Sequence, residues 1–307
     1  MKRYKLTLFG VKETTQMIAQ HLIAQGIAID LIVSIDPLIA QKTDVANYVD
    51  LKDTAAAIGA DYYTVQTYGA PEQQGDFFQE NQFEIGLVYG WQRLIPETTL
   101  TRFEKGVFGF HASPSHLPQG RGRSPLNWGI ILGKTTLYNH CFKYVPEADA
   151  GDIYSITPFE ITPCDTILTL LYKSLLIAKK EFVKLVRALE KGPVSLTPQE
   201  GKASYFPKRS PADAKIDFRT MTTQEIVNLI RGVTKPFSGA FCYTSEGIKI
   251  TFWEACVFDR LMDFSTYQLG EVIAVIYNMP VILTREGSLI VKRYEGDRRL
   301  RPQECLR

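Results

Sequence analysis

The residue types best suited to chemistry gather between residues 108 and 152. His111 ends an apolar run in the stretch FGFHASPSHLPQGRGRSPLNW, Arg121 and Arg123 flank one glycine in the same stretch, and Asp149 follows in EADAGD. A histidine exchanges protons near neutral pH, a nearby carboxylate orients the ring and stabilises its charged form, and arginine binds phosphate groups. These residue types indicate acid–base chemistry beside an anionic ligand.

The elements that would position these residues alternate between strand and helix. Strands are expected at 4–10, 27–35, 60–65, 83–90 and 105–112, with a helix at 13–25. This alternation predicts a parallel sheet with helices on both faces. His111 falls at or just past the carboxyl end of the fifth strand, the edge at which open parallel sheets bind ligands.

A long helix is expected in the middle of the chain. It follows a short helix at 124–132 and strands at 135–145 and 152–161. Thr162, Pro163 and Asp165 form a helix-start signal, and Gly192-Pro193 marks the end. The apolar residues between these signals share one face, which we expect to pack on the sheet.

The remainder of the chain has a different pattern. Thr222 and Glu225 form a capping box for a helix at 222–233, and short strands dominate beyond it. We therefore expect an α/β fold in three parts. These are a Rossmann-like catalytic domain at 1–192, a connecting segment at 193–240 that completes the substrate site, and a small β-rich, barrel-like domain at 241–307.

Composition narrows the class of protein. The formal net charge of +2 on 307 residues does not suggest a dedicated nucleic-acid binder. Five scattered cysteines without C-x-x-C spacing favour neither a disulfide framework nor a zinc site, and no apolar run reaches the length of a membrane span. No G-x-G-x-x-G follows the first strand and no P-loop motif is present. We expect a cytoplasmic protein that is neither a dinucleotide dehydrogenase nor a P-loop kinase.

The motifs resemble those of one enzyme family. FHASPSHLPQGRGRSPLNW followed by EADAGDIY resembles the 10-formyltetrahydrofolate-dependent formyltransferases, whose pattern is N-x-H-x-S-L-L-P, then R-G, then D-x-G. VYGWQRLIP is similar to the strand and loop in which that family holds the pterin. SYFPKRSPADAKIDF and LIRGVTKPFSGAFCY are similar to segments that close the catalytic domain in the sugar and tRNA branches. The resemblance is specific over residues 84–155 and 204–243.

The resemblance implies a role for several residues. His111 matches the family's histidine and would act as base or proton shuttle, and Asp149 matches the aspartate that orients it. The formyl donor would be 10-formyltetrahydrofolate, and no metal is needed. The residues expected to contact the folate are Tyr89, Gly90, Trp91, Leu94, Ile95 and Asp149.

One position departs from the family pattern. Gly109 stands where the family has an asparagine that helps to hold the formyl oxygen. Asn127, Asn139 or a main-chain N–H would have to replace this donor, or catalysis would be weakened or lost. His140 is expected to be structural and is the alternative base. Trp128 and Trp253 are expected to lie in the core.

Two basic turns are expected to bind the substrate. The residues concerned are Arg121, Arg123, Lys208 and Arg209, and their charge favours a pyrophosphate group. For Arg121 a second interpretation stays open, in which it bonds main-chain carbonyls and braces the turn.

The resemblance favours a nucleotide-linked amino sugar as acceptor, in bacterial surface-glycan synthesis. It suggests the variant associated with pseudaminic-acid-type sugars, with UDP as carrier. Methionyl-tRNA formyltransferase is an alternative, although residues 37–50 lack the basic insertion expected for the acceptor stem. A catalytically silent protein that binds folate or a sugar nucleotide is the alternative of another class. Neither a membrane nor a nucleic acid is expected as partner, and a homodimer is left open.

Overall fold

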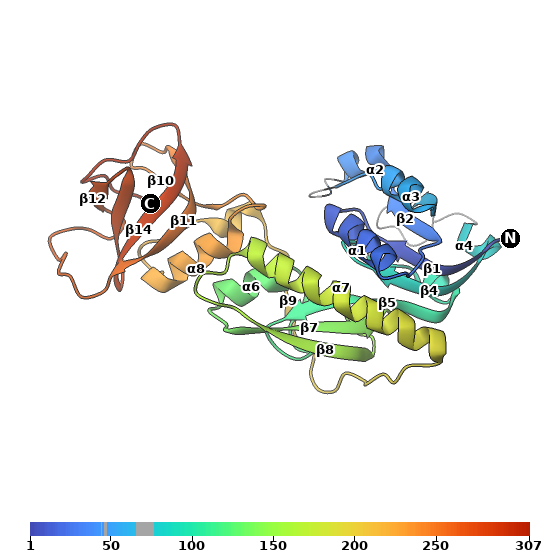
Figure 1. Ribbon diagram of the computed structural model, residues 1–307. Coiled ribbons are helices and arrows are strands. Elements are labelled where there is room, and N and C mark those ends of the chain that lie inside the picture. The colour runs from blue at the N-terminus through green and yellow to red at the C-terminus, as the bar shows by residue number, and fades with distance from the viewer. Residues whose placement is uncertain (44, 46–47, 66–76) are drawn as a thin grey trace. The chain divides into compact units, whose positions relative to one another are not determined.

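The computed structural model describes residues 1–43, 45, 48–65 and 77–307 (Figure 1). The chain folds into two compact units, each built from separate stretches of sequence. Unit 1 comprises Met1–Arg121, Tyr138–Pro158 and Lys173–Ser204, and unit 2 comprises Gly122–Leu137, Phe159–Tyr172 and Tyr205–Arg307. The division of the sequence at residues 192 and 240 stays a prediction. Residues 44, 46 and 47, within the region expected to lack a basic insertion, lie outside the described residues.

Unit 1 is built on a seven-stranded sheet with the strand order β3-β2-β1-β4-β5-β7-β8. The strands are β1 (Arg3–Phe9), β2 (Leu31–Ile35), β3 (Asp61–Val65), β4 (Gln82–Val88), β5 (Phe103–Ser113), β7 (Thr136–Lys143) and β8 (Ile153–Glu160). The first five in this order pair in parallel, and β7 pairs with β5 antiparallel. The predicted α/β fold with a parallel sheet is confirmed, with β7 as a reversed strand.

Helices cover both faces of this sheet. On one face α1 (Glu13–Ala24), α3 (Lys52–Ile58) and the C-terminal part of α7 (Ile167–Lys191) form a core with alternate strand residues, Phe108 among them. On the other face Val107 packs with Phe9, and with residues of α2 (Pro37–Lys42), α4 (Phe77–Glu80) and α5 (Glu97–Leu100). Because side chains alternate along a strand, Gly109 and His111 belong to the same face as Val107.

The long helix starts later than its sequence signal predicts. α7 begins at Ile167, whereas the signal places the start at Thr162 and Pro163. Asp165 Oδ2 accepts hydrogen bonds from the main-chain N and the Oγ1 of Thr162 at 2.7 and 2.8 Å, so this carboxylate closes a turn that precedes the helix. The predicted start is therefore wrong, while the helix and its packing on the sheet are confirmed.

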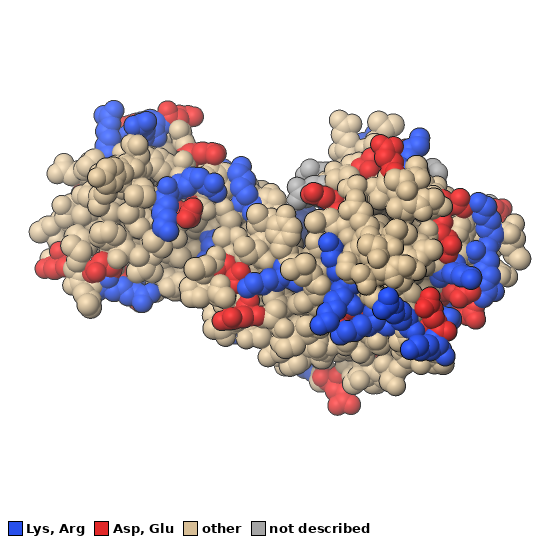
Figure 2. All heavy atoms as spheres, in the orientation of Figure 1, with Lys and Arg blue, Asp and Glu red and all other residues tan. Residues whose placement is uncertain are grey.

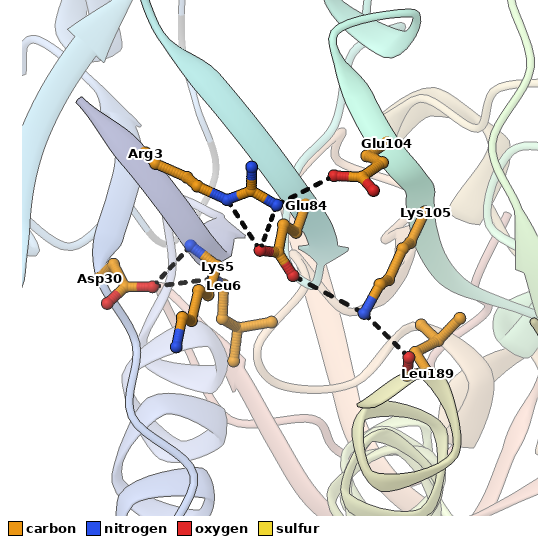
Figure 3. Close-up of polar contacts among 8 residues, drawn as sticks. All are labelled: Arg3, Lys5, Leu6, Asp30, Glu84, Glu104, Lys105 and Leu189. Carbon is orange, nitrogen blue, oxygen red and sulfur yellow. Dashed lines mark hydrogen bonds and ion pairs between the residues drawn. The ribbon is translucent and has the colours of Figure 1, made fainter. Parts of the chain in front are cut away.

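An ion network ties the amino ends of the central strands together (Figure 3). Arg3 of β1 contacts Glu84 of β4 at 2.7 Å, and Lys105 of β5 lies 3.6 Å from the same carboxylate. Lys105 also donates to the carbonyl of Leu189 near the end of α7 at 3.0 Å. Asp30 accepts from the main-chain N–H groups of Lys5 and Leu6 just before β2 begins. These charges hold the edge of the sheet opposite to His111, because the strands are parallel.

Basic side chains gather over the C-terminal half of α7 (Figure 2). A shallow hollow of about 460 Å³ lies there against α1, lined by His21, Gln25, Leu176, Lys179, Lys180, Val183 and Lys184. This surface belongs to the sheet face opposite to that of His111.

Unit 2 joins two short helices to a five-stranded antiparallel sheet with the order β10-β11-β14-β13-β12. Its elements are α6 (Pro125–Ile131), α8 (Thr223–Val233), β10 (Ala240–Tyr243), β11 (Lys249–Asp259), β12 (Val272–Ile276), β13 (Met279–Thr284) and β14 (Gly287–Gly296). The predicted capping box of α8 is present, with Thr222 and Glu225 bonded to each other. The main chain of Cys305 pairs with that of Glu271 beside β12, and the main chain of Leu306 pairs with that of Thr244 beside β10. Residues 305 and 306 thus connect to both outer strands of the sheet. The predicted β-rich unit is confirmed.

Trp253 is buried in β11, as expected for a core residue.

Across the ranges that the structure describes, no helix combines the length and apolar character that crossing a membrane requires.

Candidate active site

His111 lies near the carboxyl end of β5 with both ring nitrogens facing oxygen atoms. Its Nδ1 is 3.4 Å from Oδ2 of Asp149, and its Nε2 is 2.8 Å from the carbonyl oxygen of Gly120. A carbonyl oxygen only accepts, so Nε2 carries a proton. When Nδ1 is also protonated, the positively charged ring lies beside the Asp149 carboxylate. Only 7% of the His111 surface is exposed, so both contacts are screened little by water.

Asp149 is held in an unusual main-chain conformation. Its φ is +54°, a left-handed value that costs a non-glycine residue free energy unless the surroundings impose it. Gln199 supplies such a constraint, because its Nε2 donates to the carbonyl oxygens of both Asp149 and Gly151 at 2.8 Å. Gln199 is not among the predicted site residues, because it lies in the connecting segment at 193–240 and carries no motif.

Arg121 extends this support from the other side. Its Nε and Nη2 donate to Oε1 of Gln199 at 3.1 and 2.8 Å, and its Nη1 contacts Glu147 at 2.9 Å. Arg121 is 7% exposed. These contacts favour the bracing role over the substrate-binding role, because the guanidinium lies among protein acceptors. In the predicted bracing role Arg121 bonds main-chain carbonyl oxygens. In the structure its guanidinium bonds the side chains of Gln199 and Glu147.

His140 is buried behind His111 and holds it in place. Its Nδ1 donates to the main-chain oxygen of His111 at 3.2 Å, and its Nε2 accepts from the N–H of Leu117 at 3.3 Å. These two bonds fix one neutral tautomer. Burial lowers the pKa of His140 to about 4. A ring with both nitrogens engaged and such a weak affinity for protons fits the structural role better than that of an alternative base.

The space beside Gly109 is filled by a tyrosine. A Cβ placed on Gly109 would lie 2.6 Å from Cε1 and 2.8 Å from the hydroxyl oxygen of Tyr144. The ring of Tyr144 thus occupies the volume into which an asparagine at position 109 would extend. Tyr144 is not among the predicted site residues, because its sequence pattern indicates only a strand position.

The two asparagines expected as replacement donors are engaged elsewhere. Asn139 Nδ2 donates to the carbonyl of Ser174 at 3.2 Å, and Asn127 Nδ2 donates to the carbonyl of Gly232 at 2.8 Å. Both asparagines are buried. Asn139 belongs to unit 1 and Asn127 to unit 2. Each amide already donates to a main-chain carbonyl inside the protein, so the contacts do not favour these catalytic assignments.

The segment expected to hold folate follows β4 in unit 1. Gly90 has φ +77° and turns the chain there, while Thr15 Oγ1 donates to the carbonyl of Tyr89 at 2.6 Å. The Tyr89 ring packs edge-on against Phe110 and Phe182 in the core that contains α7. Burial raises its pKa to about 12.

Further along, this segment offers both apolar surface and unused main-chain groups. Leu94 is 57% exposed, whereas Ile95 is buried and Trp91 packs edge-on against Phe9 at 6.0 Å. The main-chain groups of Leu94 and Ile95 make no hydrogen bond within the described part of the chain. Such groups fit the hydrogen-bonding edge of a pterin, and the exposed leucine fits its apolar face.

Lys12, which is not among the predicted site residues, is a further basic residue near this segment. Its Cβ lies 3.2 Å from the position of a Cβ built on Gly90. Burial lowers the pKa of Lys12.

Over the described ranges, no three His, Cys, Asp or Glu side chains are grouped to hold a metal ion.

The other expected substrate-binding residues lie in unit 2, around one tryptophan. Trp128 of α6 is only partly buried, which corrects the prediction that it lies in the core. Its ring stacks on Phe206 with 5.8 Å between centroids, and the guanidinium of Arg209 lies 4.7 Å from the ring centre. Arg209 also donates to the carbonyl of Asp213 at 2.7 Å.

Arg123 and Lys208 are exposed beside this stack. Gly122 has φ +98°, and a Cβ there would lie 2.5 Å from the carbonyl oxygen of Phe206, so glycine is needed for the close approach. The N–H of Arg123 donates to that same carbonyl at 3.0 Å. The structure therefore brings Arg123 and the segment 206–209 together within unit 2.

Comparison with known proteins decides the fold family. Residues 208–307 match the family described as formyl transferase, C-terminal domain. The N-formyltransferase from Helicobacter canadensis, solved with folinic acid and dTDP-3-aminofucose, superposes with a TM-score of 0.66 at 16% identity, covering 94% of this chain and 98% of that one. This chain has the formyltransferase fold.

Two other solved structures share this formyltransferase fold. WlaRD, a sugar 3N-formyl transferase solved with dTDP and 5-N-formyl-THF, gives a TM-score of 0.66 at 17% identity over 96% of this chain and 98% of its own. HypX from Aquifex aeolicus gives 0.65 at 14% identity and covers 96% of this chain. The present chain spans only 45% of HypX.

Proposed function

We propose that the protein is an N-formyltransferase that moves a formyl group from 10-formyltetrahydrofolate to the amine of a nucleotide-linked amino sugar. The observation that carries the proposal is the pairing of His111 Nδ1 with Asp149 Oδ2 at 3.4 Å, at the carboxyl edge of the sheet. Formyl transfer to an amine requires removal of one amine proton, and this pair supplies an acceptor with a stabilising carboxylate.

In the proposed reaction the acceptor amine adds its lone pair to the formyl carbon, and the carbonyl π electrons move onto the oxygen. His111 takes the amine proton at Nδ1, because Nε2 already donates to Gly120. The resulting imidazolium donates to the carbonyl of Gly120 and lies 3.4 Å from the Asp149 carboxylate, so its charge is stabilised on both sides. The bond from the formyl carbon to the folate nitrogen then breaks, the carbonyl reforms, and His111 returns the proton to that nitrogen.

The formyl donor would lie along the segment from Tyr89 to Ile95. The main chain of Leu94 and Ile95 would bond the pterin edge, and the exposed Leu94 side chain would contact its ring. Folate supplies an activated formyl group on a weakly basic nitrogen. Asp149, beside His111, would face the reacting nitrogen.

A nucleotide-linked sugar is supported by the basic and aromatic residues of unit 2. Arg123, Lys208 and Arg209 would bind the pyrophosphate, and the partly buried Trp128, with Arg209 over its ring, lies beside them. The two sugar enzymes with the same fold were solved with dTDP or a dTDP-sugar. The sequence resemblance favours UDP as the nucleotide carrier. It also favours, more specifically, a pseudaminic-acid-type sugar that is used in a bacterial surface glycan.

The test is turnover with 10-formyltetrahydrofolate and a panel of acceptors. The panel holds UDP- and dTDP-linked amino sugars and charged methionyl-tRNA, and mass spectrometry detects the formylated product. We expect a formylated sugar nucleotide and release of tetrahydrofolate in equal amount. Formylation of methionyl-tRNA alone would replace the proposal with the tRNA enzyme. Tight folate binding without turnover on any acceptor would favour the silent binding protein.

A further inference from the structure

A formyltransferase needs a hydrogen-bond donor aimed at the formyl oxygen, because negative charge develops there as the amine adds. The side-chain donors expected for this task, Asn127 and Asn139, are each bonded to a main-chain carbonyl inside the protein. Arg121 is engaged by Gln199 and Glu147. Besides a main-chain N–H, the donor can come from another side chain on the sheet face that carries His111.

Tyr144 is such a group. Its main-chain N–H donates to the carbonyl of Val107 at 2.7 Å, which fixes the residue beside β5. Its ring stacks on Phe142 with 5.2 Å between centroids and reaches across the bare main chain of Gly109. Gly109 precedes His111 by two residues on one strand, so the hydroxyl lies on the same sheet face as the imidazole.

The Tyr144 hydroxyl is available and protonated. It makes no hydrogen bond within the described ranges, and it is not among the buried polar atoms sealed from solvent. Burial and the nearby Asp149 carboxylate raise the pKa of Tyr144 well above its usual value. A phenol that keeps its proton next to a carboxylate can donate to an oxygen on which charge develops.

We propose that the Tyr144 hydroxyl is the donor that stabilises the formyl oxygen during transfer, an inference that rests on the function proposed above. The hydroxyl oxygen lies 2.8 Å from the position of a Cβ on Gly109. An asparagine amide nitrogen lies roughly 2.4 Å from its own Cβ, by standard bond lengths. The tyrosine thus places its donor at nearly the distance that the expected asparagine would reach, and Gly109 is the residue that makes room for the ring.

Tyr144→Phe is the direct test, because it removes the hydroxyl and keeps the ring in its place. We expect kcat to fall on the order of 100-fold, while KM for the amino sugar and folate affinity change less than about twofold. Tyr4→Phe is the matched control: its hydroxyl bonds Asp61 at the other end of the sheet at 2.9 Å, and kcat should stay unchanged. Thermal unfolding of both variants checks that the fold is intact.

A rescue experiment separates a donor from a structural hydroxyl. Gly109→Asn alone should be destabilised, because the new Cβ would meet the Tyr144 ring at 2.6 Å. Combining Gly109→Asn with Tyr144→Ala makes room for the amide and should raise kcat at least about tenfold over Tyr144→Ala alone. A Tyr144→Phe enzyme with kcat within about twofold of the wild type would overturn the inference and leave the proposed function intact. A wild-type protein without turnover on any acceptor would overturn both.

Discussion

The side-chain amide of Gln199 donates to the main-chain carbonyl of Asp149 at 2.8 Å, and this bond joins two segments fifty residues apart. The same amide holds Gly151, and its oxygen accepts two bonds from Arg121. Asp149 keeps its left-handed φ of +54° inside this frame. The carboxylate that faces His111 is thus positioned by residues that do not contact the imidazole themselves.

Gln199→Leu should lower both stability and turnover. The substitution removes the donor to two carbonyls and leaves the buried Arg121 guanidinium without two of its acceptor contacts. We expect the free energy of unfolding to fall by about 1–3 kcal/mol, measured by urea denaturation. kcat should fall as well, because Asp149 is freed to leave its strained conformation. An unchanged kcat in a folded Gln199→Leu enzyme would show that Asp149 holds its place without this frame.

Arg121→Ala should mainly lower stability. Its guanidinium is buried and bonded to Gln199 and Glu147, so we expect a loss of about 2–3 kcal/mol with KM for the sugar nucleotide unchanged. Arg3→Ala is the matched control, because Arg3 is an exposed arginine with its own ion pairs (Figure 3) and should cost much less. A rise in KM for the sugar nucleotide without a loss of stability would contradict the bracing role and support a role of Arg121 in binding the phosphate groups.

His111→Asn should reduce kcat by at least about 100-fold while folate and sugar-nucleotide binding stay near normal. The proton acceptor is lost, whereas asparagine fits within the space of the ring. Asp149→Asn should also be severe, because it removes the charge that stabilises the imidazolium. Steady-state kinetics with calorimetric binding checks both. Retention of more than about a tenth of wild-type turnover by His111→Asn would mean that another group takes the proton.

Arg123→Ala should mainly raise KM for the nucleotide-linked sugar. The lost charge-assisted contact is worth about 1.5–3 kcal/mol, or roughly 10- to 150-fold in affinity, and folate affinity should not change. Arg209→Ala should act in the same direction and also expose the Trp128 ring that it covers. Arg219→Ala, an exposed arginine in the same unit, is the control. Equal weakening of both ligands by Arg123→Ala would argue that the loop shapes the whole pocket.

His140 should make stability depend on pH. Its pKa is about 4 in the folded protein and about 6.5 in an unfolded chain, so between these values only the unfolded chain binds the proton. The contribution is therefore fully present above about pH 6.5 and is lost as the pH falls toward 4, by about 3 kcal/mol in total. His111 and His116 lie close by, and their electrostatic influence adds to the effect of burial in lowering the pKa of His140.

Urea denaturation across this pH range checks the prediction. His140→Gln should be less stable at neutral pH and should show a flatter pH dependence, since the titrating group is gone. His21→Gln, a half-exposed histidine on α1, should keep most of the wild-type slope. The pKa values of carboxyls such as Asp61 and Glu84 are lowered in the folded protein, so their contribution to stability is lost only below about pH 4 to 4.5, at the lower end of this range. A slope equal in wild type and His140→Gln would contradict the assignment.

The alternation of strands and helices and the place of His111 were readable from the sequence, because both depend on local patterns. Side-chain periodicity defines β1 to β5 and α1, and the apolar run that ends at His111 places this residue near the end of its strand. The capping box at Thr222 and Glu225 is likewise local. The reversed direction of β7 and the later start of α7 depend on pairing and on a carboxylate turn that periodicity does not report.

Which residues face one another was decided only by the tertiary structure. Gln199 and Tyr144 carry no motif, and they matter because folding brings one against Asp149 and the other across Gly109. Arg121 and Arg123 are two residues apart and look alike in sequence, yet one is buried among acceptors and the other is exposed. The sequence determined residue types and their order along the strands. Burial and long-range hydrogen bonds, which depend on distant segments, determined the role that each residue can play.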